Sequence, residues 1–133
     1  MRWLEAGIKW IMVVAGLLTA TMFQAAVDPQ GALRSNFGET LEGPVAEIVV
    51  RNWGALIGFV GLLLLYGAFR PAVRRAALLL AAGSKAVFIG LLLSIGRPYL
   101  HFGAGIAVIV DAVLVLLFAA YLLTTRTDAG TGA

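Results

Sequence analysis

The fold is decided by residues 46–68, AEIVVRNWGALIGFVGLLLLYGA, a run that is apolar except near its start. A helix of about 20 residues rises about 30 Å, which is the thickness of the hydrocarbon core of a bilayer. Three further windows have the same character, at residues 8–27, 76–96 and 104–124. Lipid admits only helices or closed barrels, and these runs show no strand-like alternation. The sequence therefore predicts four transmembrane helices.

The composition also indicates a membrane protein whose surface is largely covered by lipid. The chain has 133 residues, of which 61% are hydrophobic and 13% are charged, whereas soluble domains carry about 25% charged residues. We therefore expect residues 1–133 to form a single membrane domain. The net charge of +3 comes from basic residues at the ends of the apolar runs. Because they form no basic stripe with interleaved aromatics, we expect membrane lipids as partners and no nucleic acid.

The residue inventory excludes several kinds of chemistry. The chain has no cysteine and one histidine, His101. Disulfides, thiol nucleophiles, iron–sulfur ligation and multi-histidine metal sites are thereby excluded for one chain. We expect no metal and no cofactor. No nucleophile–base constellation is evident, so an enzymatic role is disfavoured but left open, with Lys85 or Asp111 as the candidate acid–base group.

Loop charges orient the predicted bundle. The external loop 28–45 holds one arginine against three acidic residues, and the short links require antiparallel neighbours. Basic residues favour the cytoplasmic side. We predict an all-α, integral membrane, up-down-up-down four-helix bundle with cytoplasmic N- and C-termini, located in the bacterial inner membrane. The loop 28–45 is expected to hold one short interfacial turn of helix. The cations that set this orientation are Arg2, Lys9, Arg70, Arg74, Arg75 and Arg126.

Polar residues gather at one depth of the predicted bundle. Glu47, Arg51 and Asn52 open the second helix, Lys85 lies near the middle of the third, and Asp111 lies about 10–12 Å inside the fourth. A lone Asp or Lys near a helix centre costs about 2.5–3.5 kcal/mol on insertion scales. We therefore predict an inward-facing ion pair between Lys85 and Asp111. Arg51 pairs with Glu47 at i,i+4, or alternatively reaches Asp111, so that all five residues form one network of zero net charge.

Two features of this pattern have more than one interpretation. The network either fixes the register of the helices or marks a ligand or proton pathway. Gly54, Gly58 and Gly61 form a small-residue face that continues from Glu47 and Arg51. That face packs either inside the bundle or against a second copy or partner helix.

Two stretches, RNWGALIGFVGLLLLYGAFRP from Arg51 and SKAVFIGLLL from Ser84, resemble the DoxX-like family of small bacterial four-helix membrane proteins. The resemblance is most specific at Arg51, Trp53, Gly54 and Ser84-Lys85. Asn52 stands where histidine is commoner in that group, which puts an imidazole-based role in doubt. The resemblance implies a four-helix bundle, and some members of the group are tied to quinone-linked oxidation or to supporting partner enzymes.

Three functions are compatible with these observations. The first is a non-enzymatic accessory or structural subunit of a larger membrane complex, with partner membrane subunits or a homo-oligomer. The second is a lipid- or quinone-binding protein, redox-linked or not, that uses the polar network. The third is a small transporter that acts as a dimer.

Overall fold

The computed structural model describes the backbone of residues 2–132 and the side chains of residues 3–125. All regular structure in this part of the chain is helical. Four stretches are long and apolar enough to cross a membrane: Trp3–Val27, Pro44–Phe69, Pro71–Ser94 and Gly103–Thr125. The elements in chain order are α1 (Arg2–Ala20), α2 (Phe23–Val27), α3 (Pro29–Phe37), α4 (Pro44–Phe69), α5 (Pro71–Ser94), the 3₁₀ helix η1 (Arg97–His101) and α6 (Gly103–Gly132).

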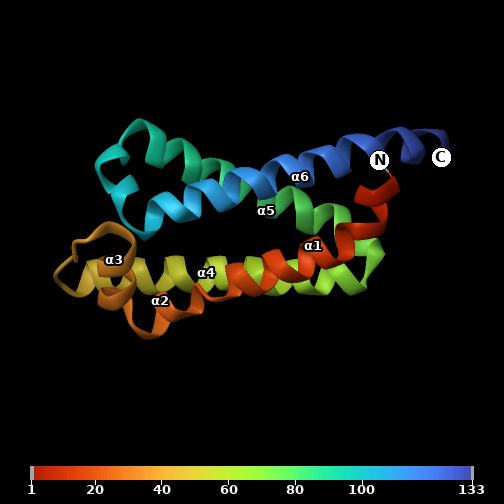
Figure 1. Ribbon diagram of the computed structural model, residues 1–133. Helices are drawn as coiled ribbons and strands as arrows, with labels where there is room; N and C mark the ends of the chain where they lie inside the picture. The colour runs from red at the N-terminus through yellow and green to blue at the C-terminus, as the bar shows by residue number, and fades with distance from the viewer. Residues whose placement is uncertain (1, 133) are drawn as a thin grey trace.

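The long helices lie in two pairs. Figure 1 shows α1 beside α4 in one layer and α5 beside α6 in the other, and α4 continues into α5 at one end of the molecule. The start of α1 and the end of α6 lie at that same end. The opposite end carries α2, α3 and η1. The side chains of Arg2 and Arg126, two of the cations used to predict orientation, lie outside the described set.

The predicted helix starts at residues 46 and 76 were too late because proline begins both helices, and the predicted start at residue 8 was also too late, since α1 begins at Arg2. α4 starts at Pro44 and α5 at Pro71, each at the first helical position, where the missing N–H of proline has no cost. The predicted spans placed Arg70, Arg74 and Arg75 in the link between these two helices. That prediction is wrong, because only Arg70 lies between the helices. Arg74 instead donates hydrogen bonds to the carbonyls of Gly67 and Ala68, at 3.1 and 2.7 Å, and so caps the C-terminus of α4.

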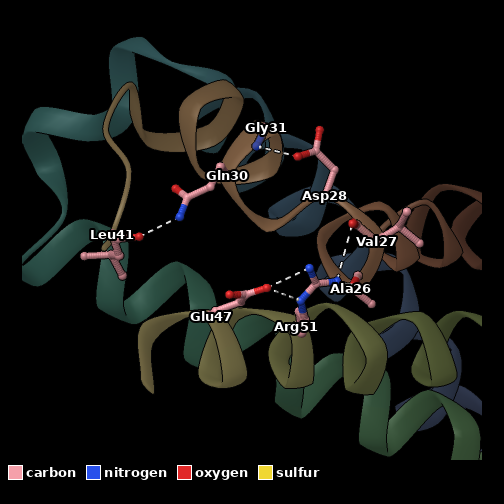
Figure 2. Close-up of polar contacts among 8 residues, drawn as sticks. All are labelled: Ala26, Val27, Asp28, Gln30, Gly31, Leu41, Glu47 and Arg51. Atoms are coloured by element: carbon pink, nitrogen blue, oxygen red, sulfur yellow. Dashed lines mark hydrogen bonds and ion pairs between the residues drawn. The ribbon is translucent and has the colours of Figure 1, made fainter. Parts of the chain in front are cut away.

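The loop 28–45, predicted to be external, is more ordered than the predicted single turn. It holds the nine-residue helix α3. Asp28 caps the start of α3 by accepting a hydrogen bond of 3.1 Å from the backbone N–H of Gly31, as Figure 2 shows, and Pro29 follows it at the first position. Gly38 ends α3 in the left-handed conformation, with φ of 72°, which glycine adopts without a Cβ penalty.

The first span is interrupted before it reaches this loop. Between Leu18 and Ala25 the backbone makes i to i−3 hydrogen bonds, such as Met22 N–H to the Thr19 carbonyl at 3.1 Å. Such tightening changes the direction of a helix. As a result α2 turns away from the axis of α1, and Thr19, at the end of α1, is buried.

The two halves of the bundle differ in packing. The half that contains the start of α1 and the α4–α5 link holds a continuous apolar core. Its members include fully buried Ile8, Met12, Leu64, Leu78 and Phe118. Dense packing of this kind leaves few voids, and it fixes the four helices at this end.

Glycines bring α1 and α2 against α4. A Cβ on Gly54 or Gly58 would lie within 3.0 Å of Met22 or Phe23, and a Cβ on Gly61 would overlap the backbone of Ala20. This face is therefore used inside the bundle, which is the packing interpretation, and it is not free for a second copy. Gly83 and Gly90 of α5 differ, because a Cβ at either would meet nothing within 4 Å.

Candidate functional site

The predicted ion pair between the third and fourth spans is present in the structure. Lys85 Nζ lies 2.8 Å from Asp111 Oδ1 and donates a second hydrogen bond, of 3.2 Å, to Thr19 Oγ1. The whole Lys85 residue is 7% exposed. Three long helices, α1, α5 and α6, thus meet at one ammonium group.

Helical spacing places these residues on the inward faces. In α5, Leu78, Ala81 and Lys85 are buried, and they repeat at three and four residues. In α6, Leu114 and Phe118 are buried three and seven residues after Asp111. A spacing of three to four residues keeps side chains on one helix face. Lys85 and Asp111 therefore occupy core positions, and each gives the other the charge partner that a low-dielectric interior requires.

A cavity of about 290 Å³ adjoins the ion pair. Lys85, Asp111 and Thr19 lie together in its wall, Thr21, Asn36 and Ser84 are its other polar lining residues, and most of the remaining wall is apolar. The cavity adjoins the apolar core, with which it shares Leu114, and extends from it towards α2 and α3 through Met22 and Asn36. Its apolar lining comes from all four long helices and includes Leu18, Met22, Trp53, Ile57, Val60, Phe88, Ile106, Val110 and Leu114.

The polar wall has unused hydrogen-bonding capacity. An ammonium group has three N–H donors and a carboxylate has two oxygens, each with two lone pairs. Lys85 uses two donors, on Thr19 and Asp111. Among the described residues, Asp111 Oδ2 accepts no hydrogen bond. One N–H of Lys85 and the Oδ2 atom of Asp111 are thus among the groups on the cavity wall that are left for a ligand or for water.

Glu47 and Arg51 form a separate cluster near α2. Arg51 donates to Glu47 Oε1 through Nε at 3.0 Å and Nη2 at 2.8 Å. Its Nη1 donates to the carbonyls of Ala26 and Val27 (Figure 2). The two side chains are 43% and 51% exposed. Arg51 therefore satisfies carbonyls left open at the C-terminus of α2, and Glu47 neutralises its charge.

The five residues do not form the single predicted network. Lys85 pairs with Asp111 inside the bundle, and Glu47 pairs with Arg51 at its outer surface. Neither Arg51 nor Glu47 lines the cavity, and among the described residues Arg51 makes no bond to Asp111. Asn52 is exposed, and its side chain makes no hydrogen bond within the described part of the chain.

Of the residues that line the cavity, only Lys85 and Asp111 were predicted as site residues, and Thr19 and Trp53 are two of those that were missed. Thr19 completes the Lys85 shell, and Trp53 lines the cavity. Thr19 does carry a sequence signal, because it is polar within an apolar span at the depth predicted for Lys85. A hydroxyl in a helix normally bonds its own backbone, and for this reason the signal is weak. Trp53 has the ordinary appearance of an interface anchor.

The end of the bundle that carries α2, α3 and η1 is held together by aromatic and polar contacts. The Tyr99 hydroxyl donates to Glu39 Oε2 at 3.0 Å, and the Tyr99 and Phe37 rings meet edge to face at 5.5 Å. The hydrogen bond to the Glu39 carboxylate raises the pKa of Tyr99 above its ordinary value. His101 is exposed at the end of η1. Among the described residues there is no group of three His, Asp or Glu side chains that could hold a metal ion.

Comparison of the chain with protein-family models, with curated proteins and with solved structures finds no match. The resemblance to DoxX-like proteins stays a prediction from the residues around Arg51 and Lys85.

Proposed function

We propose that this chain is a bacterial inner-membrane protein that binds a lipid- or quinone-class amphiphile in the cavity beside Lys85 and Asp111. The observation that carries the proposal is the unused hydrogen-bonding capacity of Lys85 and Asp111 on the wall of a 290 Å³ cavity. Ligand sites in proteins are mostly apolar hollows with a few convergent polar groups. Within a membrane, ionisable groups commonly mark such sites.

The cavity favours binding over a purely structural role for the ion pair. A buried ion pair that only fixes helix register is most stable when protein groups surround it and satisfy its remaining N–H groups and lone pairs. The apolar core at the other end of the bundle is closely packed. The Lys85–Asp111 pair instead borders open space.

The proposal includes an up-down-up-down arrangement with cytoplasmic termini. Lys9, Arg70, Arg74 and Arg75 all belong to the end of the molecule that carries the α4–α5 link. Positive residues favour the cytoplasmic side. The cavity and α3 then belong to the opposite, outer half of the membrane.

Native mass spectrometry of the protein extracted gently from its own membrane tests the binding function. We expect the chain to carry one reproducible small-molecule mass, which Lys85→Ala removes. Lys9→Ala is the matched control, because Lys9 contacts the rings of Trp10 and Phe69 and does not line the cavity. A folded chain that carries no small molecule, or carries the same one in Lys85→Ala, would contradict the proposal.

A second candidate function is an accessory subunit of a membrane complex. It is supported by Gly83 and Gly90, which lie on an outward face of α5 with open space above them. Small residues on a lipid-facing surface allow close approach of another helix. Co-release of a defined partner chain, lost in Gly83→Leu but kept in Gly7→Leu, would support this function. Gly7 also has open space around its Cβ position.

A further inference from the structure

A second hollow, of about 350 Å³, lies beside the first, and Trp53 and Phe88 line both. The two hollows therefore share these two rings as a common boundary. They differ in chemistry, because the first has Lys85, Asp111 and Thr19 in its wall and the second is almost wholly apolar. The other residues of the second hollow come from α3, α5, η1 and the link between α5 and η1, and are Leu33, Phe37, Leu91, Leu92, Ile95, Gly96 and Tyr99.

The charges of the first hollow oppose a charged ligand. Of the described residues that line it, Lys85 and Asp111 are the charged ones, and they cancel. An anionic head group would compete with Asp111 for the ammonium, and a cationic one would compete with Lys85 for the carboxylate. Either would leave a charge without its partner in a poorly solvated site, which is strongly unfavourable. A neutral head group meets no such opposition.

The unused groups specify the head more closely. Lys85 offers a donor, and Asp111 Oδ2 offers an acceptor. A hydroxyl group both accepts and donates a hydrogen bond, so one hydroxyl or a pair of adjacent hydroxyls satisfies both. An ester or ketone oxygen satisfies only Lys85. A buried polar group left without a partner reduces binding substantially.

We propose that the ligand is a neutral amphiphile with a hydroxyl-bearing head and a hydrocarbon chain. Its head bonds to Lys85 and Asp111, and its chain passes between Trp53 and Phe88 into the second hollow. This inference rests on the proposed binding function and names the class of ligand. A polar hollow joined to an apolar one matches the two parts of such a molecule.

Trp53 provides the reporter for the test. The chain has three tryptophans, and Trp3 and Trp10 lie on α1, outside both hollows. Trp3→Phe with Trp10→Phe therefore leaves Trp53 as the one fluorophore. The probes share one brominated acyl chain and differ in the head: 1-monoacylglycerol, the methyl ester of the same acid, and the monoacylglycerol carrying a phosphate. Bromine quenches tryptophan on contact, and competition with unbrominated monoacylglycerol separates saturable binding from dissolution in the micelle.

We expect saturable quenching by the monoacylglycerol and binding about tenfold or more weaker for the other two probes. The double variant Lys85→Met with Asp111→Leu should abolish this preference and keep the fold, because it removes both charges together. If the phosphorylated probe or the methyl ester binds as tightly as the monoacylglycerol, the inference about the head is overturned and the binding function stands. If no probe quenches saturably, the inference about the ligand is overturned, and the mass-spectrometric test with Lys85→Ala decides separately whether the binding function stands.

The position of the chain is tested by filling the second hollow. Leu91 lines it, whereas Leu93 is similarly exposed and lines neither hollow. Leu91→Phe should weaken binding of a long-chain monoacylglycerol towards that of a short-chain one, and Leu93→Phe should not. Equal binding of long and short chains in the unaltered protein would overturn this part of the inference.

Discussion

Lys85 and Asp111 are each the reason that the other is tolerated. The interior cannot solvate either charge alone, and their 2.8 Å contact is the main compensation. Lys85→Ala or Asp111→Ala should therefore lower the free energy of unfolding by about 3–5 kcal/mol. The double variant should lose less than the sum, because it leaves no unpaired charge.

Reversible unfolding in mixed micelles measures these differences. Glu47→Ala is the control, because it removes one member of an exposed pair and should cost no more than about 1 kcal/mol. Additive losses at Lys85 and Asp111 would show that the two residues do not stabilise each other.

Tyr99 should titrate at a higher pH than an ordinary tyrosine. Its hydrogen bond to the Glu39 carboxylate favours the protonated phenol, so its pKa is raised above about 10. The stabilisation is present below the ordinary pKa and is lost as pH rises through the raised one. Phenolate absorbance measured against pH gives the titration midpoint of Tyr99, and Tyr99→Phe identifies its share of the signal. In Glu39→Gln this midpoint should move to lower pH. An unchanged midpoint in Glu39→Gln would contradict the contact.

The Lys85–Asp111 pair was predictable from sequence, and the role of Arg51 was not. Two lone charges at similar depth in neighbouring helices have few other partners, so energy alone indicates the pair. Arg51 bonds instead to the carbonyls of Ala26 and Val27. Those carbonyls are available as acceptors because the first span is interrupted after Ala20. The sequence has no proline or other helix-breaking residue there that would predict the interruption.

At the scale of elements, the contact between α1 and α4 depends on the absence of side chains. Gly61→Ala places a Cβ against the backbone of Ala20, which cannot move as a side chain can. We expect this substitution to destabilise the protein by about 1–3 kcal/mol. Gly83→Ala is the matched control, because it meets open space and should stabilise α5 by up to about 1 kcal/mol. Similar effects at the two glycines would contradict the packing described for α4.

Hydropathy predicted the existence of the four spans, but not their proline-initiated starts. The signals for α3 were also present, with Asp28-Pro29 at its start and Gly38 at its end. These residue types serve equally in turns and as helix caps. Only the nine-residue spacing between them favours a helix, and in a mostly polar stretch that spacing is weak evidence.

At the scale of the whole molecule, the proposed orientation has a direct test. The chain has no cysteine, so a single introduced thiol reports one position. Glu42 lies just before the start of α4, and Ala72 lies at the start of α5, next to the other end of α4. Both residues are exposed. Glu42→Cys should react with a membrane-impermeant maleimide added outside intact cells, and Ala72→Cys should react only after permeabilisation. The reverse pattern would invert the proposed topology.

The cavity was beyond sequence prediction for a geometric reason. Its volume is the small difference between the space that four helices enclose and the space that their side chains fill. The sequence gives the side-chain volumes, but the helix separation near Trp53 and Ile57 follows from how α2 and α3 close the outer end.

Because one end of the molecule holds the apolar core and the other holds the cavity, the two ends should respond differently to hydrostatic pressure. Unfolding removes internal voids, so whatever part of the 290 Å³ hollow is closed to its surroundings adds to the volume of the folded state, and compression acts against it. The apolar core around Phe118 consists of side chains that are buried against one another. Compression should therefore loosen the outer end first, and a bound molecule that fills the hollow should make the two ends respond alike.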